Sequence, residues 1–108
     1  MPRMTVQGLS VAANTVSANQ LAGQLYEFLD RQMPVLLAAT SSAVGINVTF
    51  LVGGVAIVND QPISQANRFP VLPDDIVTAL RRARGRLVLT FRNTTGGALT
   101  VNASVDVG

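Results

Sequence analysis

Residues 86–107, RLVLTFRNTTGGALTVNASVDV, decide the fold, because two alternating apolar runs flank a turn-forming sequence. Leu87, Leu89 and Phe91 lie at every second position of the first run, and apolar residues hold every second position from 99 to 107. This period of two is typical of a strand with one face in a core and the other in water. The intervening NTTGG ends in two glycines, which accept positive φ. We therefore expect a β-hairpin, whose second strand carries a solvated face that includes Ser104 and Asp106.

The middle of the chain has the same character. Apolar residues alternate over residues 46–52, which predicts another half-buried strand, and residues 33–40 form a further apolar strand. Gly53-Gly54 is expected to break or bulge the first of these strands. A short β-branched run follows at residues 55–58, and Asn59-Asp60 is suited to a tight two-residue turn.

Two segments fit either a helix or a strand. The apolar residues of segment 21–31 match a helical stripe, but Gly23 disfavours a helix and strands surround the segment, so we favour a strand. In residues 75–83, acids at the start and arginines at the end match the dipole of a short helix. A strand over residues 76–79 followed by a basic loop explains that pattern equally well.

These patterns predict an all-β fold, an antiparallel β-sandwich of seven to eight short strands with jelly-roll-like topology. A short helix near residues 75–83 is the alternative noted above. Residues 20–108 are expected to form one domain, with residues 1–19 as its first strand or as an arm that pairs with a neighbouring chain. Prolines hold residues 61–75 extended as an ordered connection between sheets.

Composition argues against common enzyme chemistry. The chain has no His, Cys, Lys or Trp and only six carboxylates, so the usual proton shuttle, thiol nucleophile and most frequent metal ligands are missing. We therefore expect no catalytic residues, no cofactor and no metal site. Charged residues make up 13% of the chain, against about 25% in a typical domain, whereas 48% are hydrophobic. Part of the surface is therefore expected to be buried against another chain.

A membrane span and nucleic-acid binding are both disfavoured. Residues 33–58 carry no charge, but their glycines, hydroxyl residues and alternating pattern indicate strands rather than a spanning helix. The net charge is only +2, and no aromatic residues alternate with the arginines along the sequence, so nucleic acid is an unlikely partner.

The strongest candidate for a binding site is the run Arg81, Arg82, Arg84 and Arg86. Arginine offers a planar fork of donors that matches a phosphate or a carboxylate, so the run is suited to an acidic partner surface. The plainer interpretation is a solvated loop or helix end. Asp74-Asp75 is the only adjacent carboxylate pair, which is suited to Ca²⁺ but more often caps a helix or lies in a solvated loop.

Residues 67–75, NRFPVLPDD, and residues 86–101, RLVLTFRNTTGGALTV, resemble small jelly-roll virion proteins of tailed bacteriophages, which decorate or cement the head. The resemblance implies a non-enzymatic homotrimer on the capsid exterior that contacts the major capsid protein or other virion subunits. The partner contacts expected in this chain are Arg81, Arg82, Arg84, Arg68 and Phe69. A carbohydrate-binding or adhesin-like sandwich is the alternative, and Ca²⁺ bound by Asp60, Asp74 and Asp75 would favour it.

Overall fold

The computed structural model describes residues 3–24, 26–65, 69–70 and 74–108, and these residues contain strands and turns but no helix. The all-β prediction is confirmed. The strands are β1 (Arg3–Val11), β2 (Phe28–Ser41), β3 (Ile46–Val52), β4 (Val55–Pro62), β5 (Ser64–Gln65), β6 (Ile76–Asn93) and β7 (Leu99–Val107). They pair in the order β1-β7-β2-β6-β3-β4, with every neighbour antiparallel, and the two-residue β5 adds a parallel pairing to β2.

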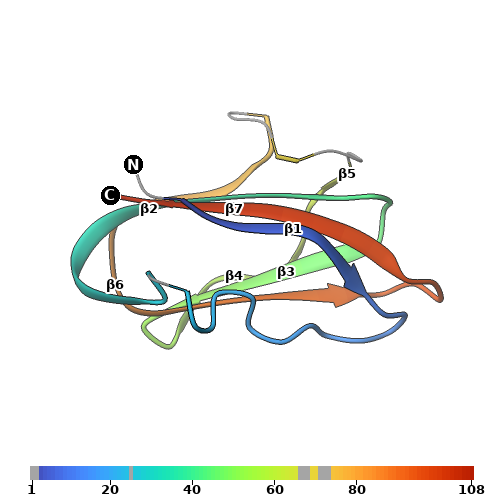
Figure 1. The fold of residues 1–108 in the computed structure, drawn as a ribbon, viewed down its shortest axis with the longest axis horizontal. Coiled ribbons are helices and arrows are strands. Elements are labelled where there is room, and N and C mark those ends of the chain that lie inside the picture. The colour runs from blue at the N-terminus through green and yellow to red at the C-terminus, as the bar shows by residue number, and fades with distance from the viewer. Residues whose placement is uncertain (1–2, 25, 66–68, 71–73) are drawn as a thin grey trace.

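The single sheet bends into two layers because β2 and β6 are long strands. β6 pairs with β2 over residues 76–86 and with β3 over residues 87–93. Figure 1 shows both long strands curving at the left, so that β1, β7 and most of β2 form one layer and β3, β4 and the end of β6 form the other. The two layers are consistent with the sandwich class, although strands of 14 and 18 residues replace the short ones expected.

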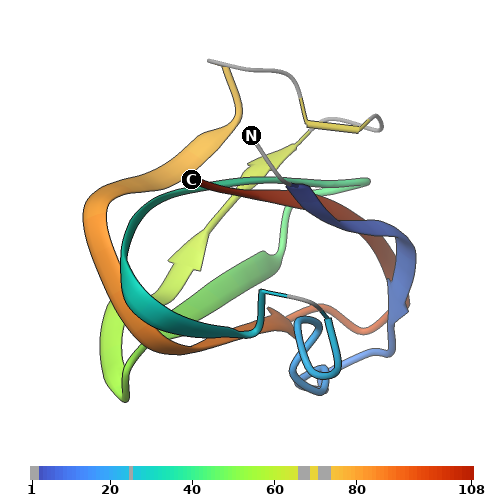
Figure 2. The same ribbon diagram turned by 60° about the vertical axis from the view of Figure 1, so that its left-hand side comes forward.

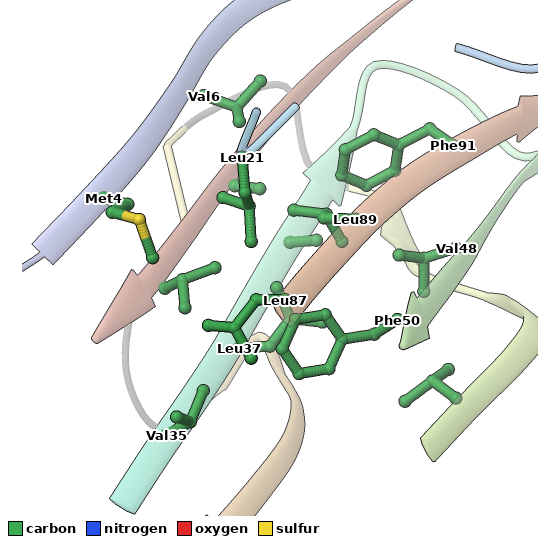
Figure 3. Packing of buried hydrophobic residues seen from close by; sticks show 14 of the residues in the cluster. Met4, Val6, Leu21, Val35, Leu37, Val48, Phe50, Leu87, Leu89 and Phe91 are labelled. Atoms are coloured by element: carbon green, nitrogen blue, oxygen red, sulfur yellow. The ribbon is translucent and has the colours of Figure 1, made fainter. Parts of the chain in front are cut away.

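The core lies between the layers and is built by the alternating residues. Leu87, Leu89 and Phe91 of β6 and Val48 and Phe50 of β3 are fully buried, and they converge with residues of β1 and β2 in Figure 3. The predicted inward faces of β3, β6 and β7 are therefore confirmed. The completely buried large side chains are Phe50, Phe91, Leu21, Leu37, Ile46, Leu87, Leu89, Val35, Val48, Val101, Val105 and Val107.

The predicted hairpin between residues 87–91 and 99–107 is wrong. β6 pairs with β3 in one layer, whereas β7 lies between β1 and β2 in the other. Residues 94–98 therefore connect layers rather than neighbouring strands. The outer face of β7 is also less exposed to solvent than expected, since Ser104 and Asp106 are buried. Asp106 accepts hydrogen bonds from Arg3 of β1, the strand that lies beside β7 in Figure 2.

Three local predictions are also corrected. The alternative helix near residues 75–83 is absent, because the described residues from Ile76 onward belong to β6. Among residues 21–27 the described ones form turns, so the strand predicted there begins only at Phe28. The two-residue turn lies at Gly53-Gly54, both with positive φ, rather than at Asn59-Asp60. The latter residues lie inside β4, where the register shifts by one residue.

Residues 14–24, 26 and 27 cover the second edge of the latter half of β6, and Figure 1 shows residues 14–24 running beside that strand. Every second backbone amide of β6 donates a hydrogen bond to this segment. The amides of Leu87 and Asn93 donate to the carbonyls of Glu27 and Thr15. The amide of Leu89 donates to Oδ1 of Asn19, and that of Phe91 donates to Oγ of Ser17. Two side chains thus replace the backbone acceptors of a regular strand. This covering segment, residues 14–24, 26 and 27, protects an edge that would otherwise be open to pairing with other chains.

Candidate functional site

The arginines singled out in the sequence lie where β6 bends. Val35 pairs with Leu80 and Met33 pairs with Ala83, so β6 holds one extra residue between these two pairs. This is a β-bulge, which places neighbouring side chains on the same strand outside the regular alternation. Arg81 and Arg82 are both exposed as a result, and Arg84 is exposed just beyond the buried Ala83.

The bend also brings in Arg31, which sequence reasoning missed. Leu29 pairs with Gly85 and Met33 pairs with Ala83, so two extra residues bulge from β2 between these pairs. Arg31 lies at the centre of this exposed insertion. We call Arg31, Arg81, Arg82 and Arg84 the arginine bend; none of the four forms an ion pair with any residue that the structure describes.

Arg86 behaves differently from the arginine bend because it has partners. Its Nε donates to Oε2 of Glu27 at 2.9 Å, and its guanidinium carbon lies 5.8 Å from the centroid of the Phe28 ring. A hydrogen bond from the backbone N–H of Gly23, followed by that from Arg86, lowers the pKa of Glu27 below its ordinary value. Glu27 and Arg86 therefore serve to anchor the covering segment to β6.

An exposed aromatic side chain completes the site. Phe28 is 66% exposed, and it lines a shallow hollow of about 300 Å³ together with Tyr26, Leu29, Asp30 and Met33. The hollow and the arginine bend share the bulged start of β2. No signal in the sequence joined them, since the aromatic residues and the β6 arginines lie more than fifty residues apart. Arginine and aromatic side chains in one patch are the composition enriched at protein interfaces.

The other predicted contacts do not join this site. Phe69 is half-buried in the connection before β6 rather than at the bend, next to the buried Pro70. Arg68 lies outside the described residues.

Two of the three expected Ca²⁺ ligands, Asp60 and Asp75, have other partners, whereas Asp74 is exposed just before β6. Asp60 accepts two hydrogen bonds from Arg92, at 2.9 and 2.6 Å, and this contact lowers the pKa of the Asp60 carboxyl. Asp75 is buried, and its carbonyl accepts from the amide of Ala39. Within the described ranges, no three His, Cys, Asp or Glu side chains are grouped as a metal would require, and no helix is long and apolar enough to cross a bilayer.

Comparison with protein-family models, with curated protein sequences and with solved structures finds no match for this chain.

Proposed function

We propose that this protein is a non-enzymatic virion structural component that decorates or cements a bacteriophage head by binding an acidic surface of a capsid subunit. The observation that carries the proposal is the arginine bend, four exposed arginines without ion pairs to described residues, beside the exposed Phe28. Free guanidinium groups bind carboxylates in a bidentate manner, and an exposed ring supplies an apolar anchor.

The virion assignment itself comes from the resemblance of residues 67–75 and 86–101, and the topology is compatible with it. The first strand, β1, pairs with the last strand, β7, and the second strand, β2, pairs with the last but one, β6. A jelly roll pairs its strands in the same way. A jelly-roll fold and a trimeric assembly on the capsid exterior belong to this proposal. The low content of charged residues supports a protein that buries much of its surface against other chains.

Co-sedimentation with capsids assembled from the major capsid protein of the same genome tests the proposal. The wild-type chain should saturate the capsids at a stoichiometry set by their symmetry. The double variant Arg82→Gln and Arg84→Gln should bind at least about ten-fold more weakly, since each lost interfacial charge contact is worth more than 1 kcal/mol. Gln7→Glu with Ser10→Glu makes the same net-charge change on exposed positions of β1, and it should bind normally. A wild-type chain that stays in the supernatant contradicts the proposal.

A carbohydrate-binding sandwich is the second candidate, and the hollow lined by Tyr26 and Phe28 is the observation that favours it. Sugar rings stack on exposed aromatic faces, and Asp30 at the same hollow would accept hydrogen bonds from sugar hydroxyl groups. Thermal-shift measurements with a panel of glycans test this function. A rise in Tm that Phe28→Ser abolishes would support it over the virion assignment.

A further inference from the structure

In the first half of β6, one strand edge pairs with no strand that the structure describes. Residues 76–86 pair with β2 on one side, whereas β3 meets β6 only from Leu87 onward. Among the described residues, no strand pairs with the other edge of residues 76–80. An open edge presents a row of backbone donors and acceptors, which is a template for an added strand.

Apolar and polar side chains together line the space beside this edge, the polar ones being Asn59, Gln61 and Thr78. A groove of about 580 Å³ lies between β4 and the start of β6, and Ile57, Val58, Pro62, Ile63, Ile76 and Val77 supply its apolar lining. Ile57 is 40% exposed and Ile76 is 39% exposed, so large apolar surface remains in water beside unpaired backbone. An added strand would therefore bury side chains as well as complete hydrogen bonds.

The charges along the edge identify its occupant. The exposed Asp74 precedes the uncharged residues 76–80, and the exposed Arg81 and Arg82 follow them. Neither Asp74 nor Arg82 forms an ion pair with a described residue. A second copy aligned antiparallel brings acid to base at both ends, whereas a parallel copy brings like charges together. The edge is thus self-complementary only about a two-fold axis, the symmetry most common in homo-oligomers.

We propose that two copies of this chain join through residues 76–80 of β6, antiparallel about a two-fold axis at Thr78, with Asp74 of each copy facing Arg82 of the other. Thr78 would then pair with itself across the axis, a favourable cross-strand pair. This contact does not rest on the virion assignment, because its partner is a second copy of the chain and it is formed by the open edge of β6. Arg82 is the residue that it shares with the arginine bend.

A charge exchange measured by analytical ultracentrifugation tests the contact. Concentrations from about 1 µM to about 500 µM bracket the weak association of a small strand-edge interface. The wild-type chain should form dimers, or hexamers where the two-fold contact joins two of the trimers proposed above. Asp74→Arg alone and Arg82→Asp alone each place like charges across the axis and should weaken the dimer at least about ten-fold. The combined variant should restore the dissociation constant to within about three-fold.

Arg31→Asp is the matched control, since it makes the same charge change as Arg82→Asp on an exposed arginine of β2, and its dimer should equal the wild type. Circular dichroism and Tm show that each variant is folded. A wild-type monomer throughout the range, a trimer without even-numbered species, or a dimer unaffected by both single reversals overturns the two-fold contact. Capsid co-sedimentation of Asp74→Arg separates the two proposals, because head binding through the arginine bend does not require the dimer.

Discussion

The backbones of Gly53 and Gly85 lie so close that neither position has room for a side chain. A Cβ on Gly85 would lie 2.9 Å from the Cα of Gly53, and a Cβ on Gly53 would lie 2.9 Å from the carbonyl oxygen of Arg84. The amide of Gly53 donates to the carbonyl of Arg86 at 3.0 Å. This contact holds the β3–β4 turn against β6, next to Arg84 of the arginine bend.

Gly85→Ala should lower the free energy of unfolding by about 2–3 kcal/mol, because positive φ strain adds to the backbone overlap. The φ of Gly85 is 99°, a conformation that residues with a side chain rarely adopt. Chemical denaturation measures the change. Gly97→Ala is the control, since its Cβ would meet nothing within 4 Å, and its stability should change by less than about 0.5 kcal/mol. Equal effects of the two substitutions on stability would contradict the close approach of the Gly53 and Gly85 backbones.

Replacing Asn19 with Ala should lower stability by about 1–2 kcal/mol, because the β6 amide of Leu89 loses its acceptor. Asn19 Oδ1 accepts from the amides of both Leu21 and Leu89. Hydrogen exchange of the Leu89 amide should accelerate more than global unfolding explains. Ser10→Ala removes an exposed hydroxyl on β1 and should leave this exchange rate unchanged. An unaltered Leu89 exchange rate in the Asn19 variant would show that the covering segment does not protect the edge.

Asn93→Ala should destabilise the fold by about 2 kcal/mol, since a buried side chain that organises the connection between layers is lost. Asn93 Nδ2 donates to the carbonyls of Val11 and Gly97, while its Oδ1 accepts from the amide of Thr95. Thermal unfolding monitored by circular dichroism measures the loss. Asn59→Ala, on an exposed position of β4, provides the comparison and should be nearly neutral. Similar Tm values for both variants would contradict this role.

Stability should fall in acid partly because Glu27 is protonated. Its pKa in the folded state is lower than the ordinary value of 4.5. The ionised carboxylate therefore stabilises the folded state fully above that ordinary value, and the stabilisation is lost as pH falls through the folded pKa. Glu27→Gln should lower Tm at neutral pH and flatten the dependence of Tm on pH between about pH 5 and about pH 3. A variant that retains the full wild-type slope would assign the acid sensitivity to other carboxylates.

The sequence predicted which residues enter the core better than it predicted which strands pair. Alternation over residues 46–52 and 87–91 depends only on each strand having one apolar side, and the inward faces of both strands are buried as expected. Pairing depends on where the chain travels between strands. Residues 93–97 have the composition of a hairpin loop, yet they cross between layers because β7 is held by β1 and β2.

The candidate site was only partly accessible from the sequence for a similar reason. Arg81, Arg82 and Arg84 are adjacent in the chain, so their run could be recognised directly. Arg31 joins them through a bulge in the pairing of β2 with β6, and Phe28 joins them through its pairing with Arg86. No local pattern indicates such a bulge or such a long-range pair. The run 75–83 looked equally helical because its charges match a helix dipole, but pairing with β2 outweighs so small an effect.

The position of β7 between β1 and β2 also constrains how the chain acquires its structure during translation. β7 pairs with β1 on one side and with β2 on the other. Because β7 follows the other strands in the sequence, β1 and β2 leave the ribosome before this partner is available. Until then their apolar faces stay exposed to other nascent chains, and closure of the sheet depends on slow, distant contacts. We therefore expect the sheet to close only after β7 has left the ribosome, with the apolar faces of β1 and β2 uncovered in the interval.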